Sequence, residues 1–176
     1  MKKTFVLIFS VCSLIANAQN NSTPTLKSVL LEQLKTTHNK QEWFVPINQS
    51  LAGLTPEQAM WKQGDANHSI GQLAYHLLFW DRQQLQKFKG EKETPFSGNN
   101  DETFNNFDKN SWASVVKQLD EVLTELEKAI ESADDAKLKS WYTNIGRIST
   151  HNAYHTGQIL YIRKQQGSWD SSKGVK

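Results

Sequence analysis

Residues 111–133 read SWASVVKQLDEVLTELEKAIESA, and this stretch carries the clearest structural signal in the 176-residue chain. Its apolar residues recur at intervals of three and four: Trp112, Val115, Leu119, Val122, Leu126, Ala129 and Ala133. Because an α-helix completes a turn in about 3.6 residues, this spacing places them all on one face. The acidic residues are assigned to the opposite, outer face: Asp120, Glu121, Glu125 and Glu127. The stretch therefore predicts an amphipathic helix.

Three further segments show the same helical spacing. The first begins at Leu26 and should end near residues 43–45, because Pro46 interrupts the helix. The second runs from Ser69 to Gly90, and the last covers about residues 143–166. No alternating pattern of useful length indicates a strand. We therefore predict an all-α fold, an antiparallel four-helix bundle with a long connection between its second and third helices.

Capping signals support these boundaries. Gln72 follows Ser69 by three residues, which is the spacing of a capping box, and Gly90 is a typical helix stop. Thr55 and Gln58 form a second capping box that predicts a short helical turn between the first two long helices.

The connection itself, residues 90–110, is rich in Gly, Asn, Asp, Glu and Thr. Connections of this length are uncommon in compact domains, so we expect either a crossover along the bundle or a lid over a functional site. Phe96, Phe104 and Phe107 predict that it packs against the bundle.

The composition excludes several classes of protein. A formal net charge of +2 is too small for a typical nucleic-acid-binding domain, and only 4 Pro and 9 Gly exclude collagen-like or low-complexity chains. With 38% hydrophobic residues, the chain is long enough to bury a core without disulfides or structural metal.

The first 18 residues have the pattern of a secretory signal peptide. Lys2 and Lys3 precede an apolar run, and Ala16-Asn17-Ala18 supplies the small residues of a cleavage site. We expect residues 1–18 to be removed and residues 19–176 to form one secreted or periplasmic domain with no membrane anchor. Cys12, the only cysteine, lies in the signal and follows Val11 rather than a small residue, which argues against a lipoprotein. The mature domain would then contain no thiol, which excludes disulfides, cysteine-ligated metals and cysteine nucleophiles.

Two of the five histidines share one face of the last predicted helix. His151 and His155 lie four residues apart, so their rings are one turn apart and close enough to bind the same cation. They interrupt the apolar series from Ile148 to Ile159, which faces the core. An imidazole buried there without a partner would be unfavourable.

His76 lies at a similar position on the second predicted helix, between the apolar residues Leu73 and Trp80. Three neutral imidazoles directed into one core would satisfy one another around a divalent cation and leave positions open for water or substrate. The alternative is that they are core histidines bonded to hydroxyl or carbonyl groups. His38 is expected to be solvated, and His68 to be a helix-start residue or, less simply, part of a pocket rim.

Other polar residues carry weaker signals. Gln158 and Gln72 are spaced to bond a ligating imidazole, although Gln72 more simply closes its capping box. Arg147 and Arg163 are the basic residues nearest the candidate site, although a solvated face explains them as well. The tyrosines near the histidines are attributed to core packing: Tyr75, Tyr154 and Tyr161. No carboxylate that could act as a general base is evident beside the three histidines.

Two segments resemble the DinB-like superfamily of four-helix-bundle proteins, namely SIGQLAYHLLFWD at residues 69–81 and HNAYHTGQI at residues 151–159. The resemblance extends from Leu26 to about Gly167. It implies a divalent metal, commonly nickel or zinc, bound by one histidine of the second helix and two of the fourth. In this chain those are His76, His151 and His155, the same three residues indicated by spacing.

The resemblance also implies a range of activities. Some members are thiol S-transferases that use bacillithiol, mycothiol or glutathione, and many have no known activity. We expect an exported, divalent-metal-dependent enzyme in which a metal-activated water or thiolate is the nucleophile, with transferase-like or hydrolase-like chemistry on an unidentified small molecule. The alternative is an exported metal-dependent module that binds a ligand or partner without turnover. No catalytic residue is assigned, no nucleic-acid partner is expected, and the assembly is left open between monomer and homodimer.

Overall fold

The computed structural model describes residues 23–64, 67–105 and 107–174. The body of the molecule consists of four long helices: α1 (Leu26–His38), α4 (Ile70–Lys89), α6 (Trp112–Ser132) and α7 (Asp135–Gln165). Shorter elements complete it: α2 (Ile47–Leu51), α3 (Pro56–Met60), α5 (Glu102–Asn105), and the 3-10 turns η1 (Lys109–Ser111) and η2 (Ser171–Lys173). No strand occurs in the part of the chain that the structure describes, which confirms the all-α prediction. The predicted signal peptide and its cleavage site lie outside the described residues.

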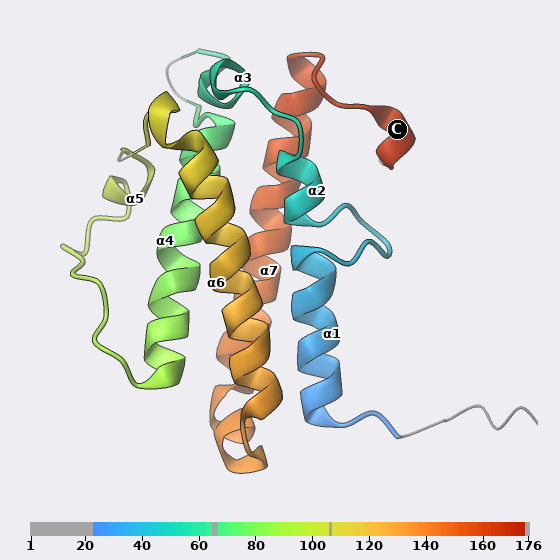
Figure 1. Ribbon diagram of the computed structural model, residues 1–176, viewed down its shortest axis with the longest axis vertical. Coiled ribbons are helices and arrows are strands. Elements are labelled where there is room, and N and C mark those ends of the chain that lie inside the picture. Colours follow the sequence, from blue (N-terminus) through green and yellow to red (C-terminus); the bar gives the residue numbers. More distant parts are fainter. Residues whose placement is uncertain (1–22, 65–66, 106, 175–176) are drawn as a thin grey trace, which may run out of the picture.

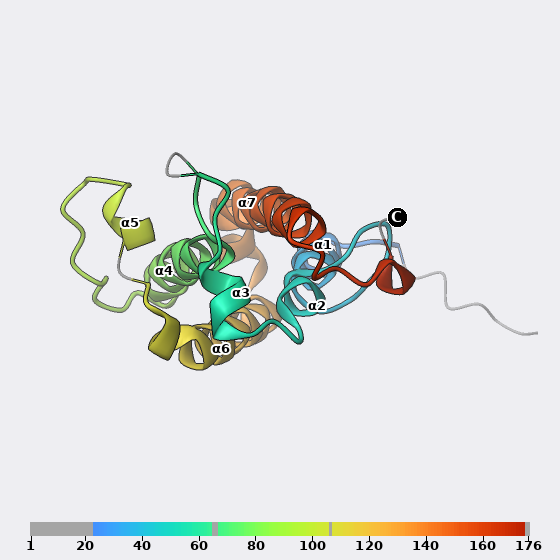
Figure 2. The same cartoon turned by 90° about the horizontal axis from the view of Figure 1, so that it is seen from above.

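The four long helices pack side by side, each against two others. Around the bundle the order is α1, α6, α4 and α7, so that α1 lies diagonally across from α4, as the view from above shows (Figure 2). The short helices α2 and α3 lie in the segment that joins α1 to α4 at one end of the bundle (Figure 1). This confirms a four-helix bundle.

The direction of the helices differs from the antiparallel prediction. α4 and α6 run the same way, as do α1 and α7, while the neighbours α4 and α7 run in opposite directions (Figure 1). The reason is the connection after α4, which returns along the length of the bundle before α6 begins (Figure 1). The connection is therefore a crossover, and its helix α5 packs against α4. Phe104 and Phe107 are buried, as predicted, whereas Phe96 remains partly exposed against Trp80.

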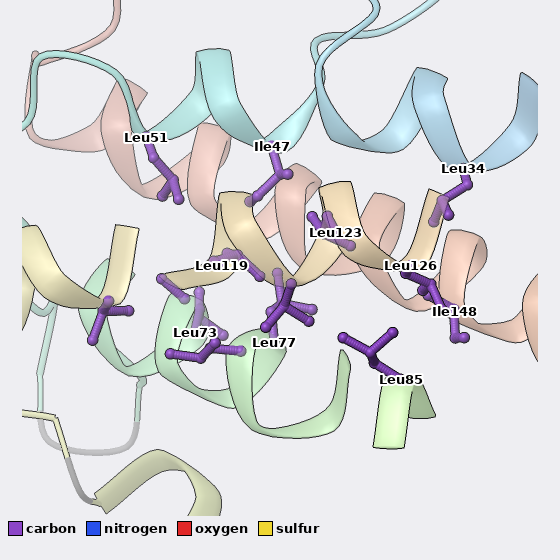
Figure 3. Close-up of a cluster of buried hydrophobic side chains, with 14 of the residues drawn as sticks. Leu34, Ile47, Leu51, Leu73, Leu77, Leu85, Leu119, Leu123, Leu126 and Ile148 are labelled. Carbon is purple, nitrogen blue, oxygen red and sulfur yellow. The ribbon is translucent and has the colours of Figure 1, made fainter. Parts of the chain in front are cut away.

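One continuous apolar core fills the space between the helices (Figure 3). Its fully buried leucines come from all four long helices and include Leu34 on α1, Leu77 on α4, Leu123 and Leu126 on α6, and Leu138 on α7. Burying a leucine side chain stabilises the fold by about 1.5–3 kcal/mol relative to exposure, so this apolar interior is the main source of stability.

Two helix boundaries differ from those expected. α1 ends at His38 and not near residue 45, because Asn39 already caps it and Trp43 is fully exposed. α7 begins at Asp135 and not near residue 143: the Asp134 side chain accepts the Lys137 N–H and starts the helix eight residues earlier. The Ser69 capping box and the left-handed Gly90 stop of α4 are confirmed. Within the described ranges, no helix is long and apolar enough to cross a membrane.

Candidate metal centre

The structure brings His76, His151 and His155 together between α4 and α7. His76 is buried on α4 between core residues, and one turn of α7 separates His151 from His155. The Nε2 atom of His151 lies 3.1 Å from Nε2 of His76 and 3.1 Å from Nε2 of His155. One ligand atom from each of the three residues lies within 4.8 Å of the others. The three histidines that the helical spacing indicated therefore lie together in the fold.

The hydrogen bonds around His76 fix which of its nitrogens carries the proton. The Thr103 hydroxyl donates its single proton to the Asn100 carbonyl at 2.6 Å, so toward His76 Nδ1, also 2.6 Å away, it can only accept. His76 is therefore protonated on Nδ1, which leaves a lone pair on Nε2 directed at the other two rings.

His155 is oriented in the same way from its own helix. Its Nδ1 donates to Gln158 Oε1 at 2.7 Å, and the Gln158 amide is held in that orientation because its Nε2 donates to the Tyr154 hydroxyl at 3.2 Å. The Nε2 lone pair of His155 thus also faces the centre of the cluster. Outer hydrogen bonds of this kind are what fixes the tautomer of a metal-ligating histidine.

The three rings are kept neutral by their surroundings. Burial and the neighbouring imidazoles lower the pKa of His76 to about 3, and burial, followed by His155, lowers the pKa of His151 to about 4. Burial also lowers the pKa of His155, against the opposing effect of the Gln158 hydrogen bond. Neutral imidazole is the form that binds metal, so at neutral pH no proton has to be removed first.

These residues fit a divalent cation. Two nitrogens bound to one ion at 2.0–2.1 Å lie about 3.3 Å apart at the tetrahedral angle, close to the 3.1 Å separations found here. The donor set is three imidazole nitrogens without thiolate, which suits zinc, nickel and other borderline divalent ions. A site with three protein ligands leaves a coordination position open for another molecule, as catalytic sites do.

A cavity of about 590 Å³ adjoins the three histidines. α4, α7 and the crossover connection line it, with Trp80, Asp81, Phe104 and Arg147 among the lining residues. A volume of this size accommodates a small-molecule ligand. The cluster therefore lies in the wall of a space that a substrate could enter.

Asp81 is a site residue that the sequence argument missed. It is 1% exposed, its Oδ2 atom has no hydrogen-bond partner in the described part of the chain, and it lines the cavity. Burial raises the pKa of its carboxyl well above the ordinary value, and the Asn152 amide offsets only part of this effect. No carboxylate general base was expected beside the histidines, and the structure adds to their cavity a carboxyl group whose burial favours the uncharged acid. The signal was available, because Asp81 follows Leu77 by four residues on the core-facing stripe.

His68 and Phe104 cover one side of His76. The Phe104 ring stacks on His76 with a centroid separation of 4.0 Å. The His68 ring stacks on the other face of Phe104, with a centroid separation of 3.9 Å. His68 itself lies two residues before α4 and is exposed. It is thus both a helix-start residue and the outer member of an aromatic stack at the site.

The expectation that His38 is solvated is wrong. Its ring is fully buried, with Nδ1 2.7 Å from Glu127 Oε1 and Nε2 2.9 Å from Asp120 Oδ1. These two acidic residues of α6 therefore contact α1 and do not simply form an outer face. His38 follows Leu34 by four residues, so it continues the buried stripe of α1, but its partners are distant in the sequence.

For other polar residues, the structure confirms some expectations and corrects others. Gln72 closes its capping box, and Tyr75 packs against the core. Tyr154 and Tyr161 are each 64% exposed and do not belong to the core. Arg163 is buried rather than solvated, and it donates to the carbonyls of the α2 segment and of Ser168.

Comparison with known proteins places this architecture in a family. The chain matches the DinB superfamily over residues 47–160, which include α4, the crossover, α6 and all three clustered histidines. Neither the curated proteins nor the solved structures gave a significant match. Since the matched region covers more than half of the chain and its bundle carries the histidine cluster, the protein belongs to the DinB superfamily.

Proposed function

We propose that the protein is an exported, divalent-metal-dependent enzyme acting on a small molecule. The observation that carries this proposal is the convergence of three neutral imidazole Nε2 atoms at the wall of a cavity of about 590 Å³. His76, His151 and His155 would hold the cation, with nickel and zinc the best matches to the donor set. When bound, such a cation acts as a Lewis acid that lowers the pKa of water or a thiol and stabilises developing negative charge.

The residues around the cluster have separate tasks in this proposal. Thr103 and Gln158 orient the imidazoles through their Nδ1 protons, while Phe104 shields His76 from water. Asp81 Oδ2 is buried and unpartnered within the described structure, so it is placed to hold a proton and exchange it with a bound molecule. A buried carboxyl group in the same cavity supports an enzyme over a module that only binds.

The type of reaction follows from the absence of a thiol in the proposed mature chain. With Cys12 in the proposed signal peptide, the nucleophile would be water or a thiol supplied by a cosubstrate. This leads to hydrolase-like or thiol-transferase-like chemistry. Export is supported by Lys2, Lys3, the apolar run and the Ala16-Asn17-Ala18 site. N-terminal sequencing of native protein tests it: Gln19 is expected first, and Met1 would contradict export.

Metal analysis of untagged protein tests the site. After incubation with zinc or nickel and removal of the excess, wild type should retain about one equivalent, as should the control His68→Ala. Each of His76→Ala, His151→Ala and His155→Ala should retain far less while keeping the helical circular dichroism spectrum. Wild type retaining only trace metal, about a tenth of an equivalent or less, would contradict the proposal.

Activity is tested on the metal-loaded protein. Panels of thiol-plus-electrophile pairs and of hydrolysable esters and amides should reveal turnover that His151→Ala abolishes. Metal binding without turnover on both panels would favour the non-catalytic binding module.

A further inference from the structure

Among the described residues that line the cavity beside the three histidines, one side chain, Arg147, carries a permanent positive charge. Arg147 lies on α7 one turn before His151 and lines this cavity. Within the described ranges, its guanidinium makes no hydrogen bond or ion pair, in contrast to Arg163 of the same helix, whose guanidinium bonds three carbonyl groups. An arginine that keeps its donors free in a cavity wall is available to a ligand.

The rest of the lining does not neutralise this charge. Asp81 is the one acidic residue among the described residues that line the cavity, and burial favours its uncharged acid. The other hydrogen-bonding side chains on the wall, apart from the histidines and the Trp80 indole, are amides: Gln84, Asn100 and Asn144. The described lining therefore carries one formal positive charge and no charged acid, which favours an anion.

Part of the cavity wall is apolar. Trp80, Phe104 and Ile148 contribute two aromatic rings and an aliphatic side chain. The Trp80 ring is fixed, because its Nε1 donates to Asn100 Oδ1 at 3.2 Å and its edge meets the His76 ring at a centroid distance of 6.5 Å. Arg147 precedes His151 by four residues, so the backbone positions of these two residues are about 6 Å apart along the helix axis.

We propose that the cavity binds a small organic carboxylate, with the carboxylate on Arg147, the apolar body against Trp80 and Phe104, and the reacting group toward the three histidines. This assignment rests on the proposed function and specifies its substrate class. A carboxylate matches a single planar guanidinium, which can donate two parallel hydrogen bonds to it. A phosphate ester carries up to two charges and would find only one cationic side chain on the described wall.

A binding experiment tests this without requiring turnover. The probes are 3-phenylpropanoate and its uncharged amide, 3-phenylpropanamide, titrated into metal-free and zinc-loaded protein and followed by protein NMR shifts. Wild type should bind the carboxylate about tenfold more tightly than the amide, and Arg147→Gln should lose this preference. The control is Arg82→Gln, which removes the same charge from α4 at a position bonded to Gln118 and outside the cavity lining. It should keep the preference.

The possible failures are distinguishable because metal content is measured in the same samples. If the protein binds no metal but still prefers the carboxylate in a way that depends on Arg147, the anion site is supported and the proposed metal centre is contradicted. Full metal binding with equal affinity for the two probes, or with equal losses in the Arg147 and Arg82 variants, contradicts the anion site alone. No binding of either probe contradicts it as well.

Discussion

Replacing Thr103 with valine should weaken metal binding without unfolding the bundle. The hydroxyl of Thr103 accepts the Nδ1 proton of His76 and donates to the Asn100 carbonyl. Valine keeps the shape but offers no acceptor, so the buried Nδ1–H of His76 loses its partner. An unsatisfied buried donor costs about 1–3 kcal/mol, which corresponds to a loss of roughly 5- to 150-fold in affinity if the ring shifts its proton to Nε2 and blocks the lone pair.

The assay is competition between the protein and a chelator for zinc or nickel, with helicity followed by circular dichroism. Thr103→Ser retains the hydroxyl and should restore most of the affinity. Thr37→Val is the matched control, because it also removes a buried hydroxyl bonded to a backbone carbonyl, but on α1, outside the cluster of His76, His151 and His155. The reasoning is refuted if Thr103→Val binds metal as tightly as wild type, or if Thr37→Val weakens binding equally.

Three further results are expected. First, the metal-free protein should lose stability as the pH falls below about 6.5. In the unfolded chain the clustered histidines gain protons there, whereas their lowered pKa values delay protonation in the folded state. Thermal unfolding from pH 7.5 to 4.5 measures the loss of stability, and a flat profile would contradict the prediction. Second, His38→Gln should cost about 2 kcal/mol or more in denaturant titration, because it disrupts the buried bonds to Glu127 and Asp120; a change below about 0.5 kcal/mol would show that these bonds contribute little. Third, Gly71→Ala should lower the free energy of unfolding by about 1–3 kcal/mol and loosen the crossover, because the added Cβ would overlap the Phe107 ring. Protease sensitivity within residues 90–110 should rise, and an unchanged cleavage pattern would argue against this prediction.

The sequence predicted the features that local chemistry determines. The capping residues Ser69 and Gly90 bound α4 because each satisfies backbone groups within one turn of itself. His151 and His155 could be identified because a four-residue spacing on a core-facing stripe is a local property. The same rule, applied to Leu34 and Leu77, would also have placed His38 and Asp81 in the interior.

Features that depend on distant partners were not predictable in this way. No local pattern relates His38 to carboxylates 82 and 89 residues away. Nothing near His76 indicates that its Nδ1 partner is Thr103, on the crossover. The parallel direction of α4 and α6 is likewise set by the path of that connection, and composition left a crossover and a lid equally open.

Different parts of the molecule determine its stability and its metal affinity, and the crossover connects the two. The imidazoles come from α4 and α7, neighbours held together by the apolar core shown in Figure 3. The orientation of His76, however, depends on Thr103 and Phe104 of α5, which belongs to the crossover and packs against α4. Substitutions in the core should therefore change the free energy of unfolding first and metal binding only as a consequence. Substitutions in the crossover should change metal binding while the helices remain intact. A domain built this way can vary the crossover, and with it the cavity wall formed by Asn100 and Phe104, without altering the bundle that positions the three histidines.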